Sequence, residues 1–134
     1  MQLVDTNVLS ELMRQQPNAG VLLWLQGRQR VTTRIKISAI TVDEIMLGLA
    51  WSPSVRLQRW FDAFLQSNEV LPITIDIARR AGELSARLKA QGQTRAQADR
   101  LIAATAQIYD LTVVTRNVND FAGCGVGVLN PFQE

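Results

Sequence analysis

The stretch of residues 3–12, LVDTNVLSEL, predicts a β-strand, a turn and an α-helix in immediate succession. Its first two residues are apolar, as in short buried strands. The run Asp5-Thr6-Asn7 then supplies residue types that cap helices, and apolar side chains recur at helical spacing over residues 8–13. We therefore expect Asp5 to lie where a strand ends and a helix begins.

Outward from this stretch, short apolar segments alternate with helical patterns along the chain. Apolar or β-branched runs predict strands over residues 34–40, 70–73, 111–114 and 126–129. Apolar residues at helical spacing predict helices over residues 19–26, from Thr41 onward, and over 52–68, 74–90 and 96–109. Short strands separated by helices indicate a parallel sheet that is covered on both faces. We therefore expect an α/β fold, a three-layer α/β/α sandwich with a small, mostly parallel sheet of about five strands.

The composition restricts both the class of protein and its chemistry. The chain has 134 residues, 47% of them hydrophobic and 19% charged, so we expect a single domain over residues 1–134. It contains no histidine and one cysteine, Cys124. This excludes Ser-His-Asp and Cys-His mechanisms, zinc sites that use imidazole, and an internal disulfide.

The sequence also gives an expectation about location. No apolar run approaches the roughly 20 residues that span a bilayer, so we expect no membrane partner. The Asp5 carboxylate stands where a signal peptide would carry positive charge, and the extended apolar stretch of a signal peptide does not follow it. We therefore expect a cytoplasmic protein.

The charge balance is mildly basic and uneven. The net charge is +2 and the sequence pI is near 9.2. Arg28, Arg30, Arg34 and Lys36 follow one another with no acid between them, and residues 79–100 form a second basic stretch. Such patches suit a polyanionic partner, and solvated arginines on helix faces would give the same pattern.

Four carboxylates stand at positions that each have a structural explanation. Asp5 is placed as a helix N-cap, and Glu44 completes a capping box with Thr41. Asp99 lies near the start of an apolar helical run, where its charge suits the helix dipole, and Asp120 lies in a turn. Taken singly, each is better explained by structure than by function.

Taken together, the four carboxylates predict a metal site. Asp5, Glu44 and Asp120 each follow a predicted strand, and Asp99 begins the helix that leads into the strand before Asp120, so the fold could bring all four to one edge of the sheet. Two like charges about 4 Å apart repel by about 4 kcal/mol at an effective dielectric near 20, so such a cluster either acquires raised pKa values or recruits a divalent cation. Oxygen ligands without imidazole favour Mg2+ or Mn2+ over Zn2+.

A metal ion at this edge would suit phosphoryl chemistry. It can activate a water molecule and stabilise the leaving oxygen of a phosphodiester, so no side-chain nucleophile is needed. Neutral polar side chains beside the carboxylates could orient water or the metal ligands; they are Thr6, Asn7, Thr115 and Asn117.

Four motifs follow one another along the whole chain. They are residues 4–12 (VDTNVLSEL), 38–48 (SAITVDEIMLG), 98–106 (ADRLIAATA) and 114–121 (VTRNVNDF), the last followed by 125–131 (GVGVLNP). Together they resemble the PIN-domain ribonuclease toxins of bacterial type II toxin–antitoxin modules, the VapC/FitB-like group. Each motif alone is weak, and the presence of all four in this order makes the resemblance specific.

The resemblance implies a Mg2+-dependent endoribonuclease, with Mn2+ able to substitute, in which Asp5, Glu44, Asp99 and Asp120 form a catalytic and metal-binding quartet. It also implies a PIN fold, a homodimer, and a cognate antitoxin that covers the active site. The antitoxin would form a larger assembly with the toxin and bind operator DNA through its own domain. Basic side chains are then candidate contacts to the RNA substrate; they are Arg28, Arg30, Arg34, Arg100 and Arg116.

Two positions depart from the pattern of that family. Arg100 follows Asp99 where a small residue is frequent, so its guanidinium would either compete with the metal for that carboxylate or contact RNA phosphate. Gln93 stands where an arginine is common, so a contact to the antitoxin or the substrate would differ here.

Two other functions compete with the nuclease hypothesis. A catalytically inactive PIN-like binding partner would keep the fold, with Arg100 in the place of the metal. A phosphatase or phosphorelay receiver also carries acids at strand ends, but a receiver requires a lysine after a late strand. Lys36 and Lys89 are the only lysines, and neither lies there.

Overall fold

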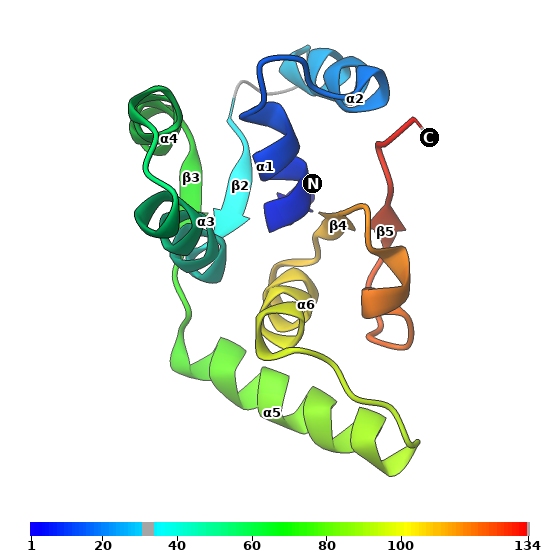
Figure 1. The fold of residues 1–134 in the computed structure, drawn as a ribbon. Helices are drawn as coiled ribbons and strands as arrows, with labels where there is room; N and C mark the ends of the chain where they lie inside the picture. The colour runs from blue at the N-terminus through cyan, green and yellow to red at the C-terminus, as the bar shows by residue number, and fades with distance from the viewer. Residues whose placement is uncertain (31–33, 134) are drawn as a thin grey trace.

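The computed structural model describes residues 1–30 and 34–133 (Figure 1). In chain order the elements are β1 (Gln2–Val4), α1 (Thr6–Leu12), α2 (Ala19–Gln29), β2 (Lys36–Ser38), α3 (Ala39–Trp51), α4 (Val55–Ser67), β3 (Glu69–Leu71), α5 (Ile75–Ala90), α6 (Gln97–Tyr109), β4 (Thr112–Val114), the 3-10 helix η1 (Val118–Phe121) and β5 (Val128–Leu129). The strands and helices expected from the sequence are present, with bounds that differ by a few residues. Within the described ranges, no helix is long and apolar enough to cross a membrane.

The strands pair in parallel in two ladders. β1, β4 and β5 form one ladder, with Leu3 opposite Val113, and β2 and β3 form the other, with Ile37 opposite Val70. β1 and β2 contact each other, so the two ladders lie side by side and β1, β2 and β4 end at a common edge. The predicted small parallel sheet is confirmed, and this edge positions the site described below.

Different helices bury the two faces of the sheet, which confirms the three predicted layers. Val4 and Val114 pack with side chains of α1, α2, α3 and α4, while their neighbours Leu3 and Val113 pack with side chains of α5 and α6. This division follows from the alternation of side chains along a strand. The four strand residues are at most 2% exposed, and burial of each stabilises the fold by ~1.5–3 kcal/mol. In Figure 1, α1 and α2 lie on one side of the strands and α5 and α6 on the other.

The predicted capping box at the start of α3 is wrong. The helix begins at Ala39, and the Ser38 hydroxyl caps it by accepting a hydrogen bond from the Ile40 N–H at 3.2 Å. The reason is that β2 ends at Ser38, so a capping side chain is already in place three residues before Thr41. Thr41 therefore lies inside the first turn of α3, and Glu44 does not cap the helix.

The C-terminal segment is fastened to the start of α2. Asn18, the N-cap of α2, accepts a hydrogen bond from the Gln133 N–H at 2.9 Å and donates one to the Gln133 carbonyl at 2.8 Å. The segment crosses Gly20 so closely that a Cβ there would collide with its backbone. The neighbouring Phe132 ring lies 4.9 Å from the guanidinium carbon of Arg116. The segment therefore connects α2 to the turn after β4.

Several large apolar side chains remain exposed. They lie in the second half of α3 and at the first residues of α4 and α5, and they are Leu47 (68% exposed), Trp51 (88%), Val55 (69%) and Ile75 (78%). Exposed apolar side chains that gather on a surface are typical of protein contacts.

Candidate active site

Asp5 lies at the carboxyl end of β1 and caps α1, as the sequence predicts. It is 5% exposed, and its Oδ1 accepts a hydrogen bond from the Thr6 N–H at 2.8 Å. Its Oδ2 accepts hydrogen bonds from Thr115 Oγ1 at 2.8 Å and from Asn7 Nδ2 at 3.3 Å. Because an ionised carboxylate offers about four lone-pair positions, these three donors leave Oδ1 able to accept one further ligand.

Asn7 and Thr115 join Asp5 to the turn after β4. Asn7 Nδ2 donates to Thr115 Oγ1 at 3.1 Å, and Asn7 Oδ1 accepts from the Arg116 N–H at 3.0 Å. The Thr115 hydroxyl, which is fully buried, also accepts from the Asn117 N–H at 3.0 Å. The structure therefore brings Asn7, Thr115 and Asn117 together as the sequence predicts, with Asn117 acting through its backbone.

Glu44 reaches the same place from α3. The Thr6 hydroxyl donates a hydrogen bond to Glu44 Oε1 at 2.5 Å and is hydrogen-bonded to the Thr41 hydroxyl at 3.1 Å. Thr41 is fully buried and was not predicted as a site residue, because the expected capping box accounted for it. Its three-residue spacing from Glu44, which puts both on one helix face, was the signal that could have found it.

Asp99 and Asp120 complete the acidic quartet. Asp99 lies in the first turn of α6, and Asp120 lies in η1. Burial, together with the charges of Asp5, Asp120 and Glu44, raises the pKa of Asp99 to about 6. Asp99 therefore lies close enough to the other three carboxylates for their charges to act on it.

The pKa of Asp5 is raised by the same causes. Burial is the largest cause, and the charges of Glu44 and Asp120 add to it. The hydrogen bonds from the Thr115 hydroxyl and the Thr6 N–H act in the opposite direction, because they favour the ionised carboxylate. Burial and the neighbouring negative charges thus destabilise the ionised form of Asp5, while the hydrogen bonds hold its carboxylate in one orientation.

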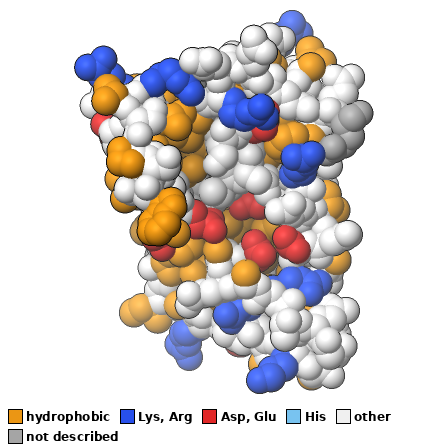
Figure 2. Space-filling model, in the orientation of Figure 1, with side chains coloured by type: hydrophobic (Ala, Val, Ile, Leu, Met, Phe, Trp, Pro, Cys, Tyr) orange, Lys and Arg blue, Asp and Glu red, His pale blue; other side chains and the backbone are white. Residues whose placement is uncertain are grey.

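The donor set fits a hard divalent cation. Figure 2 shows acidic side chains gathered near the middle of one face of the molecule, with lysine and arginine side chains above and below them. Among residues 1–30 and 34–133, no three Asp, Glu or Cys side chains are arranged to hold a metal ion as they stand. A loose group of carboxylates nevertheless suits Mg2+, which keeps several water ligands and usually takes only one or two carboxylates directly.

Arg100 does not neutralise the quartet. In the part of the chain that the structure describes, Arg100 forms no ion pair with Asp99, and its buried Nε has no hydrogen-bond partner. The cation that opposes the raised pKa of Asp99 is Arg95, which the sequence did not single out. Its guanidinium donates to the Ala122 carbonyl at 2.8 Å and to Gln93 Oε1 at 3.3 Å, so it also ties the loop before α6 to the segment after η1.

The five arginines predicted to contact RNA do not share one surface. Arg100 lies beside Asp99 in α6, and Arg116 lies in the turn after β4, both at the acidic end of the sheet. Arg28 and Arg34 line a pocket at the amino ends of β1 and β2, the opposite end of the sheet, and Arg30 is exposed at the end of α2. Their contacts to RNA stay predictions.

A groove with apolar walls lies beside Glu44, between α1, α3 and α4. Its volume is about 350 Å³, and Glu44 is part of its lining. Apolar side chains from the three helices form much of the rest; among them are Met13, Ile45, Leu49 and Leu57. A chain bound in this groove would extend to the acidic quartet.

Residues 3–122 match the family model described as PIN domain. The chain is 34% identical over 140 residues to "VapC ribonuclease Y4jK" of Sinorhizobium fredii, covering 99% of each protein, and 36% identical over 141 residues to "Toxin FitB" of Neisseria gonorrhoeae, covering 100% of each. The fold is similar to that of FitAcB from Neisseria gonorrhoeae, with a TM-score of 0.85, 35% identity and 98% of each chain covered. It is also similar to that of VapBC2 from Rickettsia felis bound to a DNA fragment from their promoter, with a TM-score of 0.83, 25% identity and 96% of each chain covered.

Proposed function

The chain belongs to the PIN-domain family, and from this premise we propose that it is a metal-dependent endoribonuclease that acts as the toxin of a toxin–antitoxin module. The relatives named as a VapC ribonuclease and a FitB toxin match it over nearly their full length, which supports this assignment. The observation that carries the proposal is the convergence of four carboxylates on one edge of the sheet, which raises the pKa of Asp99 to about 6.

The carboxylate cluster is more readily explained by function than by stability. Burying Asp5 near the charges of Glu44 and Asp120 costs stability, because burial and these charges disfavour ionisation of Asp5. Strongly shifted pKa values that arise from burial and specific charge partners are typical of functional sites. A divalent cation would remove this repulsion.

The residues that would hold the cation are Asp5, Glu44, Asp99 and Asp120, and their oxygen donors suit Mg2+ or Mn2+. When bound, the cation would supply an activated water and would stabilise negative charge on the leaving oxygen of the phosphodiester.

The surrounding side chains hold the acids in position. Thr115 and Asn7 fix the Oδ2 side of Asp5, and Oδ1, which accepts only from the Thr6 N–H, keeps an acceptor position for a ligand. The Thr6 hydroxyl fixes Glu44. Positioning of this kind lowers the cost of ordering the site when RNA binds. Arg116, placed beside Asn7 and packed on the Phe132 ring, is the arginine best placed to contact RNA phosphate near the acids.

We also propose an antitoxin that occupies the apolar groove beside Glu44. A similar structure from Klebsiella pneumoniae is described as a toxin–antitoxin complex, and VapBC2 is bound to a DNA fragment from their promoter. A segment bound there would cover the partly exposed Leu57 and the exposed Glu44, and it would block RNA from reaching the acids. Contact with operator DNA would come from the antitoxin's own domain.

A homodimer is the assembly we infer for the toxin itself. Trp51 and Ile75, at 88% and 78% exposure, are large apolar side chains that water solvates poorly, and the exposed Leu47 and Val55 flank Trp51 in the sequence. Contact with a second copy would bury them.

The central test is cleavage of RNA by the purified protein. We expect cleavage in the presence of Mg2+ or Mn2+ and none with EDTA, and we expect Asp5→Asn and Asp99→Asn to abolish both cleavage and growth inhibition on induction. The matched control is Asp62→Asn, because Asp62 is an exposed aspartate of α4 that is far in sequence from the quartet. Full activity of both quartet variants would overturn the proposal.

A catalytically inactive PIN-like partner is the alternative, and two observations disfavour it. Arg100, which would have to replace the metal, makes no ion pair with Asp99 among the described residues. The relatives matched over their full length carry ribonuclease and toxin names. Calorimetric titration with Mn2+ separates the two, because the inactive partner would show no binding that depends on Asp5 and Asp99.

A further inference from the structure

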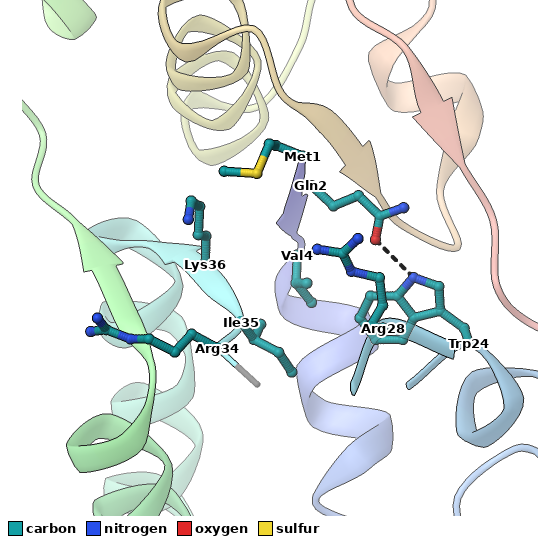
Figure 3. A pocket seen from close by; sticks show the side chains of 8 residues that line it. All are labelled: Met1, Gln2, Val4, Trp24, Arg28, Arg34, Ile35 and Lys36. Atoms are coloured by element: carbon teal, nitrogen blue, oxygen red, sulfur yellow. Dashed lines mark hydrogen bonds between the residues drawn. The ribbon is translucent and has the colours of Figure 1, made fainter. Parts of the chain in front are cut away.

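A second pocket lies at the end of the sheet opposite the acidic quartet. Its volume is about 210 Å³, and side chains from β1, from α2 and from the start of β2 line it (Figure 3). Arg28, Arg34 and Lys36 belong to the lining, and no Asp or Glu among the described residues does. The pocket therefore presents positive charge, which favours an anion.

Trp24 gives this pocket an aromatic wall that is fixed in place. Its indole Nε1 donates a hydrogen bond to Gln2 Oε1 at 3.0 Å, which ties α2 to β1. The dashed line in Figure 3 marks this contact. Because the indole N–H already has a partner, the ring has only apolar and π surface to offer a ligand. Such surface is suited to a planar base.

The three cations differ in what they can offer a ligand. Lys36 Nζ is paired with Glu69 Oε1 at 3.0 Å, so its charge is partly neutralised. In Figure 3 the Arg34 side chain extends away from Trp24, whereas the Arg28 guanidinium lies between Trp24 and Val4 on the side of the pocket. None of the ion pairs among the described residues uses Arg28. A guanidinium is suited to bind phosphate with two parallel hydrogen bonds.

We propose that this pocket binds one ribonucleoside monophosphate, with its base against Trp24 and its phosphate on Arg28. The pocket is smaller than the roughly 300–1,000 Å³ of sites for drug-sized ligands, so it suits a single nucleotide and not a stacked run of bases. The nucleotide is either free or a terminal unit of RNA, and the second source rests on the proposed ribonuclease function.

The pocket is an anchoring site and takes no part in the chemistry. Gln2 and Asp5 are three residues apart along an extended strand, a span of ~10 Å, and none of the four acids lines the pocket. RNA held at both places would have to bridge this distance. The pocket would then add affinity to RNA without touching the scissile bond.

Two-dimensional NMR of the full chain in EDTA tests the proposal without cleavage. The chain has three tryptophans, so each indole N–H signal reports on one place. Adenosine monophosphate is expected to shift the Trp24 signal and leave the signals of Trp51 and Trp60 in place. Inorganic phosphate and adenosine are each expected to bind at least about tenfold more weakly, since each lacks one of the two contacts.

Short RNAs with and without a terminal phosphate distinguish the two sources of the nucleotide. Tighter binding of the phosphorylated RNA than of the free nucleotide assigns the pocket to RNA, and the reverse order assigns it to a free nucleotide. Both results support a nucleotide site. Because EDTA suppresses metal-dependent cleavage, a failure of binding leaves the proposed ribonuclease function untouched.

Charge-matched variants complete the design. Arg28→Gln is expected to weaken binding of the nucleotide by about tenfold or more, because it removes a charge-assisted hydrogen bond. Arg59→Gln, on the exposed surface of α4, makes the same charge change and is expected to leave binding unchanged. The proposal is overturned if millimolar nucleotide leaves the Trp24 signal in place, if the exposed Trp51 shifts equally, or if phosphate alone binds as well as the nucleotide.

Discussion

Thr115 Oγ1 donates a hydrogen bond to Asp5 Oδ2 at 2.8 Å, and the two residues directly follow Val114 and Val4, which are register partners in neighbouring parallel strands. Parallel pairing of β1 with β4 therefore sets the distance between the acid and the hydroxyl that orients it. The Thr115 hydroxyl also accepts hydrogen bonds from two nitrogen donors, so its single proton is left for Asp5. The orientation of Asp5 is thus fixed by the sheet and not by α1 alone.

Thr115→Val is expected to reduce metal affinity or RNA cleavage by roughly 10–100-fold, as is typical when a group that orients a metal ligand is removed. The substitution keeps the shape of the side chain and removes the hydrogen bond that favours the ionised form of Asp5. Thr115→Ser keeps the hydroxyl and is expected to retain most of the activity. Cleavage rates and Mn2+ titration measure both effects, and equal activity of the Val variant and the original protein would contradict this role.

Asp99 is expected to make the metal-free protein less stable at neutral pH than in mild acid. Its pKa is about 6 in the fold and 3.8 in the unfolded chain, so between these values the folded state binds more protons than the unfolded state. The free energy of unfolding therefore falls as the pH rises through this window, and it stays low above about pH 6. Asp5, whose pKa is also raised, acts in the same direction.

Thermal unfolding in EDTA at several pH values measures this dependence. Asp99→Asn is expected to raise the Tm above pH 6 and to flatten the slope, and Asp62→Asn is the control with an exposed aspartate. An unchanged pH dependence in Asp99→Asn would show that the acidic cluster does not strain the fold.

Addition of Mg2+ or Mn2+ is expected to stabilise the protein above pH 6. A ligand at 100 times its Kd adds about 2.7 kcal/mol, which for a domain of this size raises the Tm by roughly 10 °C. The increase should become smaller in mild acid, where protons compete with the cation for Asp99. Asp5→Asn should abolish it, and an undiminished increase in that variant would place the cation elsewhere.

The sequence predicts the main features of the fold because they depend on local patterns. The alternation that places Leu3 and Val4 on opposite faces, and the cap at Asp5, are properties of a few neighbouring residues. The start of α3 is different, because Ser38 and Thr41 are both good caps and lie three residues apart. The end of β2, set by its pairing with β3, decides between them.

The sequence predicts the acids of the candidate site but not the places of Arg28 and Arg95. The four acids could be grouped from the sequence alone because parallel strands bring their carboxyl ends together. The place of Arg28 could not be predicted in this way, since it depends on the length of α2 and on the packing of Trp24 against Gln2. Arg95 acts on Asp99 through a loop whose path no local pattern specifies.

Trp51→Glu is expected to convert a homodimer into a monomer. A carboxylate at a buried contact is costly, whereas Trp51 is 88% exposed in the single chain, so the fold itself should tolerate the change. Leu23→Glu, at a 64% exposed position of α2, is the control. Light scattering of the purified proteins gives the mass, and a dimer that persists in Trp51→Glu would exclude this residue from the interface.

Gly20→Ala is expected to destabilise the protein, although helix propensity predicts the opposite. Alanine in a helix is favoured over glycine by up to about 1 kcal/mol, but a Cβ at position 20 would collide with the backbone of Pro131 and Gln133. The C-terminal segment would have to leave Asn18, and Phe132 would lose its contact with Arg116. Gly27→Ala in the same helix is the matched control, because no atom lies within 4 Å of a Cβ there. We expect a lower Tm and weaker RNA binding for Gly20→Ala alone; a Tm equal to that of Gly27→Ala would mean that the segment is not held against α2 in solution.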